Sequence, residues 1–290
     1  MVGLFIEEGP IVQVKDREGN PMVLRDKDKS VLYNGPLAVM VNEFSASASE
    51  IFAAAIQDYG RGIVLGSSST YGKGTVQRAY GLDPESNFMS SNSDLGSIKL
   101  TLQKFYRING GSTQLKGVVP DVVIPDRYEY LEYREKHNEE AMPWDEISKS
   151  AYSKWTSPID IQTVKNLSSS RIASNPTFKT IQETTSWLSQ QSDKAFPLQI
   201  DKFKDEQKKI RAAVAKMDSV LKLDKALNMA FLEEDAKRIA ADKDKEARYQ
   251  QWLSGLSKDI YLDQAVKTVG DMVNQQNLAK KGSQQPLKSF

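Results

Sequence analysis

The chain has 290 residues, of which 39% are hydrophobic and 27% are charged, and its formal net charge is +1. This composition predicts a packed protein long enough for two domains, and the balanced charge argues against a strong general attraction to nucleic acid or to an acidic membrane. No apolar run approaches the ~20 residues that a membrane span needs. The absence of cysteine excludes disulfides, thiolate catalysis and zinc sites built from cysteine.

The start of the chain reads as the interior of a fold. Residues 1–8 lack the basic start and the long apolar core of a secretory signal peptide, so we expect any export signal to lie in a part that this sequence does not include. Residues 11–15 are rich in β-branched side chains, a Gly-Asn-Pro turn follows at 19–21, and residues 22–24 are apolar again. This pattern predicts a β-hairpin.

The next segment changes from strand to helix and back to strand. Residues 37–41 form a continuous apolar run, which is typical of a strand covered on both faces. Residues 47–58 have helical spacing in an alanine-rich stretch that ends at Gly60, and residues 62–66 predict a second buried strand. Strand, turn, helix and strand make the βαβ pattern, so we expect a parallel pair.

The composition then divides the chain. Residues 80–96 are polar and predict an exposed loop, and residues 98–102 alternate between apolar and polar side chains, as in a half-exposed strand. Further on, glycine becomes rare and apolar residues recur at helical spacing. The sequence therefore predicts an α/β (α+β) domain with a βαβ unit over residues 1–128, a mainly helical domain over 129–280 and a loose tail over 281–290.

Ser47 stands where the first buried strand gives way to the helix. With Glu50 it forms Ser-x-x-Glu, a capping box that satisfies free N–H groups at a helix start, and this structural role is one interpretation. The other interpretation is catalytic, because a helix start directs unpaired N–H groups at one point and acyl transfer needs such groups at the oxyanion. Ser47 would then attack a carbonyl carbon while the N–H of Ala48 binds the oxygen.

A serine nucleophile needs a proton acceptor, and the chain offers few. The single histidine, His137, lies in a charged run that predicts a solvated side chain rather than an ordered base. Lys73 lies between Gly72 and Gly74 without an adjacent acid, and a lysine acts as a base when burial lowers its pKa. Gln77 is placed to hold the lysine amine by a hydrogen bond. The structural alternatives are an exposed loop lysine and a surface glutamine.

The glycine-rich stretch 66–75 has some likeness to a phosphate-binding loop. Its glycine-to-glycine spacing is one residue too long, Gly74 rather than serine or threonine follows Lys73, and no strong helix comes next. We therefore expect no nucleotide, and we also expect no other cofactor and no metal.

Several stretches of the sequence together resemble the C-terminal processing peptidases, and among these the bacterial tail-specific proteases. The paired serine and lysine motifs are specific in combination, and the likeness continues more weakly into the helical half. The stretches that carry it are residues 35–39, 42–43, 45–50, 57–58, 72–77, 116–121 and 142–145.

The resemblance implies a periplasmic serine endopeptidase that uses a Ser-Lys dyad. It implies protein or peptide substrates with exposed apolar C-termini, and it allows a lipoprotein adaptor as a further partner. Ser47 matches the nucleophile of this family and Lys73 its general base. Gln77 matches the residue that orients the lysine in several members, and Ala48 matches one oxyanion donor.

Members of this family also have a PDZ domain and, upstream of the nucleophile, a glycine-rich strand end that supplies the second oxyanion donor. No PDZ-like segment precedes the motifs here. We therefore expect the later part of a protease core followed by a C-terminal helical domain, with little or no activity by itself. The alternative is a non-catalytic binding module whose helical half docks a partner protein.

Overall fold

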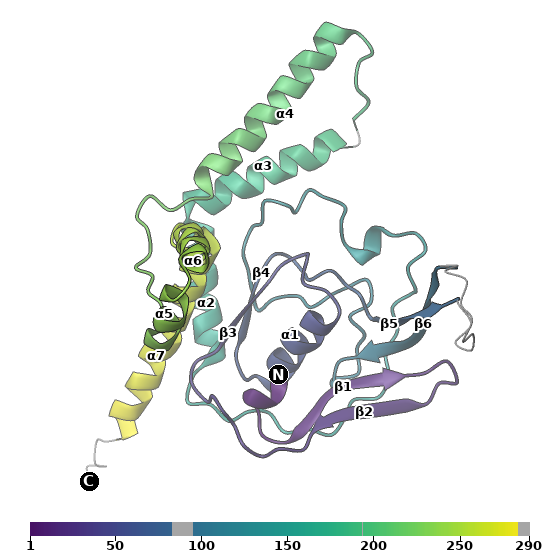
Figure 1. The fold of residues 1–290 in the computed structure, drawn as a ribbon, viewed down its shortest axis with the longest axis vertical. Coiled ribbons are helices and arrows are strands. Elements are labelled where there is room, and N and C mark those ends of the chain that lie inside the picture. The colour runs from purple at the N-terminus through teal and green to yellow at the C-terminus, as the bar shows by residue number, and fades with distance from the viewer. Residues whose placement is uncertain (83–94, 193, 284–290) are drawn as a thin grey trace, which may run out of the picture. The chain divides into compact units, whose positions relative to one another are not determined.

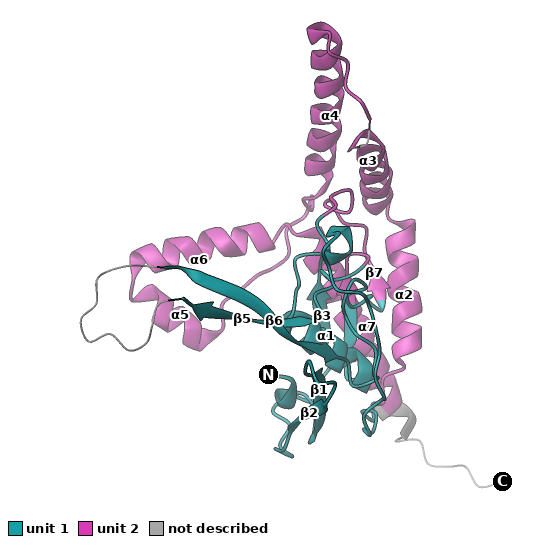
Figure 2. Ribbon diagram, turned by 90° about the vertical axis from the view of Figure 1, so that its right-hand side faces the viewer, with its two compact units in different colours: residues 1–64, 69–121, 133–157 teal, residues 65–68, 122–132, 158–290 magenta. Residues whose placement is uncertain are grey.

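The computed structural model describes residues 1–82, 95–192 and 194–283, which fold into two compact units (Figures 1 and 2). Unit 1 contains Met1–Val64, Ser69–Asp121 and Tyr133–Ser157. Unit 2 contains Leu65–Ser68, Val122–Glu132 and the chain from Pro158 onward. The chain thus enters unit 2 near the predicted boundary at residue 128, but then returns to unit 1. We call Tyr133–Ser157 the return segment.

The larger sheet of unit 1 has the strand order β2-β1-β6-β5. Strands β1 (Gly9–Lys15) and β2 (Pro21–Asp26) form the predicted antiparallel hairpin, whose turn is closed by a 2.8 Å hydrogen bond from the Asn20 N–H to the Asp16 carboxylate. Strands β5 (Thr75–Gly81) and β6 (Ser97–Tyr106) pair antiparallel over their length.

The outer half of β6 is more exposed than its alternating pattern predicts. Only the last residues of β6 pair with β1, while the rest pair with β5 alone. Ile98 and Leu100 are each 46% exposed because no further layer covers them among the described residues. Of the predicted loop over 80–96, residues 83–94 lie outside the described part of the chain, while Tyr80 and Gly81 belong to β5.

The βαβ pattern is confirmed by β3 (Ala38–Val41), α1 (Ala48–Tyr59) and β4 (Ile63–Gly66), and β4 also pairs in parallel with the short β7 (Val122–Val123). The apolar residues of β4 are fully buried, as predicted. Strand β3 differs from the prediction, because Met40 is 44% exposed and of its four residues Val41 alone is buried.

The core of unit 1 is built around the alanine-rich helix α1. Ala54 packs with Val41 and Val64, while Ala55 packs on another side of the helix with Ile6 and Ile108. Small alanine side chains allow this close approach on more than one face. Helix α1 is thereby packed against β3 and β4.

Unit 2 is mainly helical, as predicted, and its helices contact one another in the pairs α2·α7, α3·α4 and α5·α6. Apolar residues of α3 at helical spacing, such as Phe178, Ile181 and Leu188, are buried. Among the described residues, no helix has the length and apolarity to cross a membrane. The helices are α2 (Ile161–Ser174), α3 (Pro176–Ser192), α4 (Ile200–Val220), α5 (Glu233–Ala240), α6 (Lys243–Leu256) and α7 (Ile260–Ser283).

Two short 3-10 helices, Val2–Leu4 and Glu135–His137, complete the described elements. His137 is exposed, in agreement with the sequence prediction. Helix α7 continues through the first three residues of the predicted tail, and the remaining tail residues, 284–290, lie outside the described part of the chain.

Candidate active site

Ser47 is the N-cap residue of α1, at the predicted turn from strand to helix. Its backbone has φ 54° and ψ −110°, and within the described ranges Ser47 and Leu115 are the two non-glycine residues with positive φ. Such a conformation is costly for a residue with a side chain, and it recurs at functional sites, including the strained turn that presents the nucleophile in some serine hydrolases. The predicted turn therefore has a strained backbone that the sequence did not reveal.

The N–H of Ala48 is placed to bind a negative oxygen. Ala48 is exposed and is the first residue of α1, where the intrahelical partner of an N–H group is missing. Within the part of the chain that the structure describes, no acceptor is found for this N–H, whereas the next two N–H groups donate to Ala46 and Ser47. Ala48 can thus supply one oxyanion donor at the positive end of a helix.

Lys73 lies in the loop between β4 and β5 and is half-buried. Its Nζ donates to Oε1 of Gln77 at 3.0 Å, which is the contact expected from the sequence. The Gln77 amide nitrogen in turn donates to the Thr101 hydroxyl at 3.3 Å on the neighbouring strand. The lysine amine is thus directed by a side chain that β6 holds in place.

The two motifs meet at the carboxylate of Glu50, which is fully buried. Its Oε2 accepts from the N–H of Ser47 at 2.8 Å and from the N–H of Lys73 at 2.9 Å. Because both N–H groups bind the same oxygen atom, the backbones of the nucleophile and base candidates lie next to each other. A second link is the 3.0 Å hydrogen bond from the Tyr71 N–H to the Ser45 carbonyl.

The other oxygen of Glu50, Oε1, binds the loop before Lys73. It accepts from the Thr70 hydroxyl at 2.6 Å and from the Gly72 N–H at 2.7 Å. Burial raises the pKa of the Glu50 carboxyl, and the hydrogen bonds from Thr70 and the three N–H groups counteract part of that rise. All four contacts are donors, so the carboxylate is the form that satisfies them all.

The two glycines beside Lys73 are required by the tight packing of its loop. Gly72 has φ +96°, and its carbonyl accepts from the Leu115 N–H at 2.8 Å. A Cβ atom on Gly74 would lie 2.7 Å from both the Gln114 backbone nitrogen and the Ser112 hydroxyl. We call residues 69–74, which lead to Lys73 and into β5, the base loop. The Gly-Lys-Gly sequence therefore reflects the close approach of this loop to residues 112–115.

Comparison with known proteins identifies the family of this chain. Residues 1–124 match peptidase family S41, and residues 128–274 match the C-terminal domain of tail specific protease. The chain belongs to the S41 family of tail-specific proteases. The resemblance predicted from the sequence is thereby confirmed, and the family is one of serine-type peptidases.

The S41 relatives differ in how much of the chain they match. The tail-specific protease of Haemophilus influenzae is 38% identical over 279 residues, which is 93% of this chain and 37% of that protein. The carboxy-terminal-processing protease of Bartonella bacilliformis is 34% identical over 43% of this chain and 27% of its own length. The carboxy-terminal processing protease CtpA of Bacillus subtilis is 36% identical over 46% of this chain and 26% of its own length. The chain thus spans about a third or less of these relatives.

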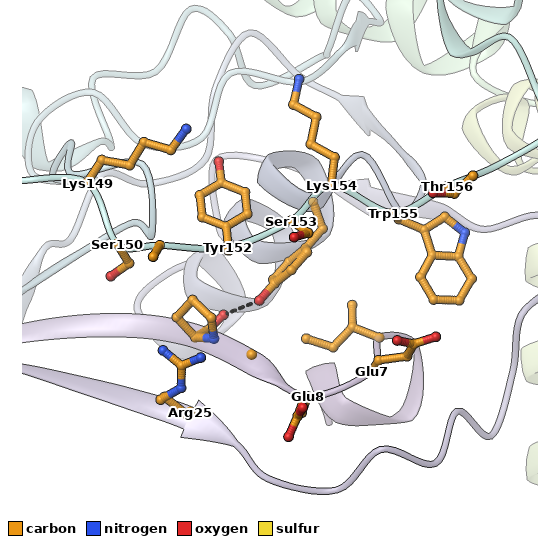
Figure 3. Close-up of a pocket in the computed structure, with 15 residues that line it drawn as sticks. Glu7, Glu8, Arg25, Lys149, Ser150, Tyr152, Ser153, Lys154, Trp155 and Thr156 are labelled. Atoms are coloured by element: carbon orange, nitrogen blue, oxygen red, sulfur yellow. Dashed lines mark hydrogen bonds between the residues drawn. The ribbon is translucent and has the colours of Figure 1, made fainter.

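A cavity of this S41 chain lies elsewhere in unit 1 (Figure 3). It has a volume of about 1020 Å³, and Tyr59, Tyr152 and Trp155 contribute aromatic rings to its wall. The Tyr59 hydroxyl donates to the Pro10 carbonyl at 2.8 Å beside it. Neither Ser47 nor Lys73 lines this cavity, so it is separate from the candidate site at the start of α1.

Sequence reasoning missed two residues of the site. It interpreted Glu50 as a helix cap alone, although Glu50 also binds the base loop at Thr70 and Gly72, 20 and 22 residues away. It also assigned no role to Thr70, which is fully buried and accepts from the Val118 N–H at 2.7 Å. The Ser-x-x-Glu spacing was the one available signal for Glu50, and nothing local indicated Thr70.

Proposed function

We propose that this chain carries the Ser-Lys dyad of a tail-specific serine endopeptidase. The observation that supports it most is the single Glu50 oxygen that accepts from the N–H groups of Ser47 and Lys73. In the proposed reaction, the neutral Lys73 amine takes the Ser47 hydroxyl proton as Oγ attacks the carbonyl carbon of the scissile peptide bond. The carbon–nitrogen bond breaks, Lys73 returns the proton to the leaving amine, and an acyl-enzyme remains.

Water completes the reaction by the reverse use of the same groups. Lys73 accepts a proton from the attacking water, the ester bond to Ser47 breaks, and the serine regains its hydroxyl proton. In both halves the N–H of Ala48 stabilises the oxyanion, while Gln77 orients the lysine amine. These roles assign Ser47 and Lys73 to catalysis, Ala48 to the oxyanion and Gln77 to orientation of the base.

We further propose that this chain by itself has little activity. The family resemblance places a second oxyanion donor upstream of the nucleophile, and losing one such donor costs about 10²–10³-fold in other acyl-transfer enzymes. The chain also spans only 37% of its Haemophilus relative. The full-length protease that contains it would act in the periplasm on proteins with exposed apolar C-termini, with a lipoprotein adaptor as a further proposed partner.

The test compares peptide hydrolysis by this chain, by the full-length protease and by its Ser47→Ala and Lys73→Ala variants. We expect hydrolysis by the full-length protease, a much lower rate for this chain and loss of activity in both variants. A serine-reactive acylating probe should label Ser47 of the full-length protease. An unchanged rate in Ser47→Ala would refute the dyad, and a full-length protein that neither hydrolyses peptides nor reacts with the probe would favour the binding-module alternative.

A further inference from the structure

We call residues 43–47, which end at Ser47, the nucleophile turn. Three residues of the return segment contact both this turn and the base loop, although they lie far from both in the sequence. We propose that Tyr133, Arg134 and Glu135 are positioning residues of the active site, and that the C-terminal domain sequence of tail-specific proteases supplies them. The match to family S41 ends at residue 124, and these residues lie within the match over 128–274. The inference rests on the proposed function, because it concerns the geometry of the same dyad.

Glu135 holds the base loop on both sides of Lys73. Its N–H donates to the Tyr71 carbonyl at 3.0 Å, two residues before Lys73. Its carboxylate accepts from the Gln114 amide at 3.1 Å, and the oxygen of that amide accepts from the Gly74 N–H at 2.7 Å. Burial, with a further contribution from a hydrogen bond to Glu135, raises the pKa of the Tyr71 hydroxyl, so this tyrosine stays a proton donor to the carboxylate.

Arg134 reaches the turn that precedes the nucleophile. Its Nη2 lies 4.0 Å from Oε2 of Glu43, and the two side chains are only 2% and 1% exposed. Neither carboxylate oxygen of Glu43 has a hydrogen-bond donor among the described residues, so Arg134 is the cation that balances this buried charge. Arg134 also donates through Nε to the Ser69 carbonyl at 3.4 Å, which connects it to the base loop.

Tyr133 adds an aromatic contact to each loop. The centroid of its ring lies 4.9 Å from that of Phe44, three residues before Ser47, and 5.8 Å from that of Tyr71. The three consecutive residues thus bind the nucleophile turn and the base loop by ring contacts, a buried ion pair and hydrogen bonds. An error of about 1 Å in the placement of catalytic groups can cost about 10²-fold in rate, so this connection has a direct catalytic consequence.

The first experiment uses Glu135→Ala in the full-length protease, with the exposed Glu139→Ala as a matched control from the same segment. We expect kcat to fall by about 10²-fold for Glu135→Ala with KM changed less than about threefold, because substrate contacts remain while the base is misplaced. Glu135→Gln keeps an oxygen for Gln114 and should recover most of the rate. The pH profile of Ser47 acylation should also change in Glu135→Ala.

The rates are expressed per folded molecule, from the fraction that remains native by circular dichroism, so that a loss of stability does not imitate a loss of positioning. Because Arg134→Gln leaves Glu43 as a buried unpaired charge, it is paired with the double variant Glu43→Gln/Arg134→Gln, which removes both charges. We expect the double variant to regain native folding but not the wild-type kcat.

Two results would overturn the proposal: wild-type kcat and pH profile in Glu135→Ala, or wild-type kcat in the folded double variant. Ser47→Ala distinguishes a failure of the positioning role from a failure of the proposed function. If Ser47→Ala is inactive while the variants at residues 43, 134 and 135 behave as wild type, the dyad stands and the positioning role fails. If Ser47→Ala retains full activity, the proposed function itself fails.

Discussion

At the scale of single residues, the candidate site depends on one buried carboxylate. Glu50 caps the helix that Ser47 begins and also fixes the loop that carries Lys73, because its two carboxylate oxygens accept from four donors. Because Glu50 binds the backbone N–H groups of both residues, the half-buried Ser47 and the half-buried Lys73 have neighbouring backbones in unit 1. Two substitutions test this arrangement.

The first is Glu50→Gln, which keeps the shape of the side chain but replaces one acceptor oxygen by a donor NH₂ group. Two of the four buried donors then face another donor, and each unsatisfied group costs about 1–3 kcal/mol. We expect a clear decrease in the urea midpoint of unfolding and a loss of peptidase activity in the full-length protease. Glu183→Gln, at an exposed position of α3, should change stability by no more than about 0.5 kcal/mol. Equal effects of the two substitutions would contradict the role of Glu50.

The second is Gly74→Ala. The added methyl group would lie 2.7 Å from the Gln114 backbone nitrogen, so the base loop must move. We expect kcat to fall by about 10²-fold while the fold persists, because a small displacement of Lys73 is enough to impair proton transfer. Gly81→Ala, at the last residue of β5, is the control, since nothing lies within 4 Å of the Cβ position there. The measurement is kcat of the two variants from steady-state kinetics. Similar kcat values would show that the base loop accommodates the methyl group without displacing Lys73.

At the scale of elements, the return segment connects two neighbouring strands of the larger sheet, β1 and β6. Asp145 binds Lys15 on β1 together with Lys104 and Tyr106 on β6. Nearby, the indole N–H of Trp144 donates to the Ser112 carbonyl at 2.9 Å. The return segment therefore stabilises the sheet whose β5 carries Gln77.

This connection predicts a pH dependence of stability. Burial acts to raise the pKa of Asp145, but hydrogen bonds from Lys104, Lys15 and Tyr106 outweigh it, so the pKa lies below its ordinary value. A lowered carboxyl pKa gives stability that is present above about pH 4 and is lost as the pH falls further. We expect Asp145→Asn to lower the Tm at pH 7, with the difference from wild type shrinking below pH 4. Glu18→Gln in the exposed turn is the control, and a constant Tm difference across pH would contradict the assignment.

At the scale of the whole molecule, the family boundary near residues 124–128 does not coincide with the compact units. Residues 133–157 belong to the C-terminal match in sequence but to unit 1 in structure. The helical unit proper resumes at Pro158. Unit 1 of this chain therefore includes a piece of what sequence comparison assigns to the C-terminal domain.

A truncation experiment follows from this arrangement. We expect a chain ending at residue 157 to unfold cooperatively in urea and to retain a hydrogen-exchange-protected β1 and β6. A chain ending at residue 128 loses the contacts of Asp145 and Trp144, and we expect it to be much less stable or unfolded. Circular dichroism during urea titration provides the comparison. Equal stability of the two truncated chains would show that the return segment is not part of the core.

Features that depend on near neighbours in the chain could be predicted from the sequence. The hairpin turn at 19–21, the change from strand to helix at Ser47 and the helices after residue 158 all follow from turn residues and apolar periodicity, which act within a few residues. The Lys73–Gln77 contact also came from spacing alone. The serine and lysine motifs together were specific enough to indicate the family.

The contacts between these local features could be seen only in the tertiary structure. The double use of Glu50, the burial of Thr70, the exposure of Met40 and the approach of Arg134 to Glu43 each join residues far apart in the chain or depend on what covers a surface. Periodicity carries no information about such partners, because hydrogen bonds and burial between distant segments are set by how the whole chain packs. The strained φ of Ser47 belongs here too, since the surrounding contacts impose it rather than the residue's own preference.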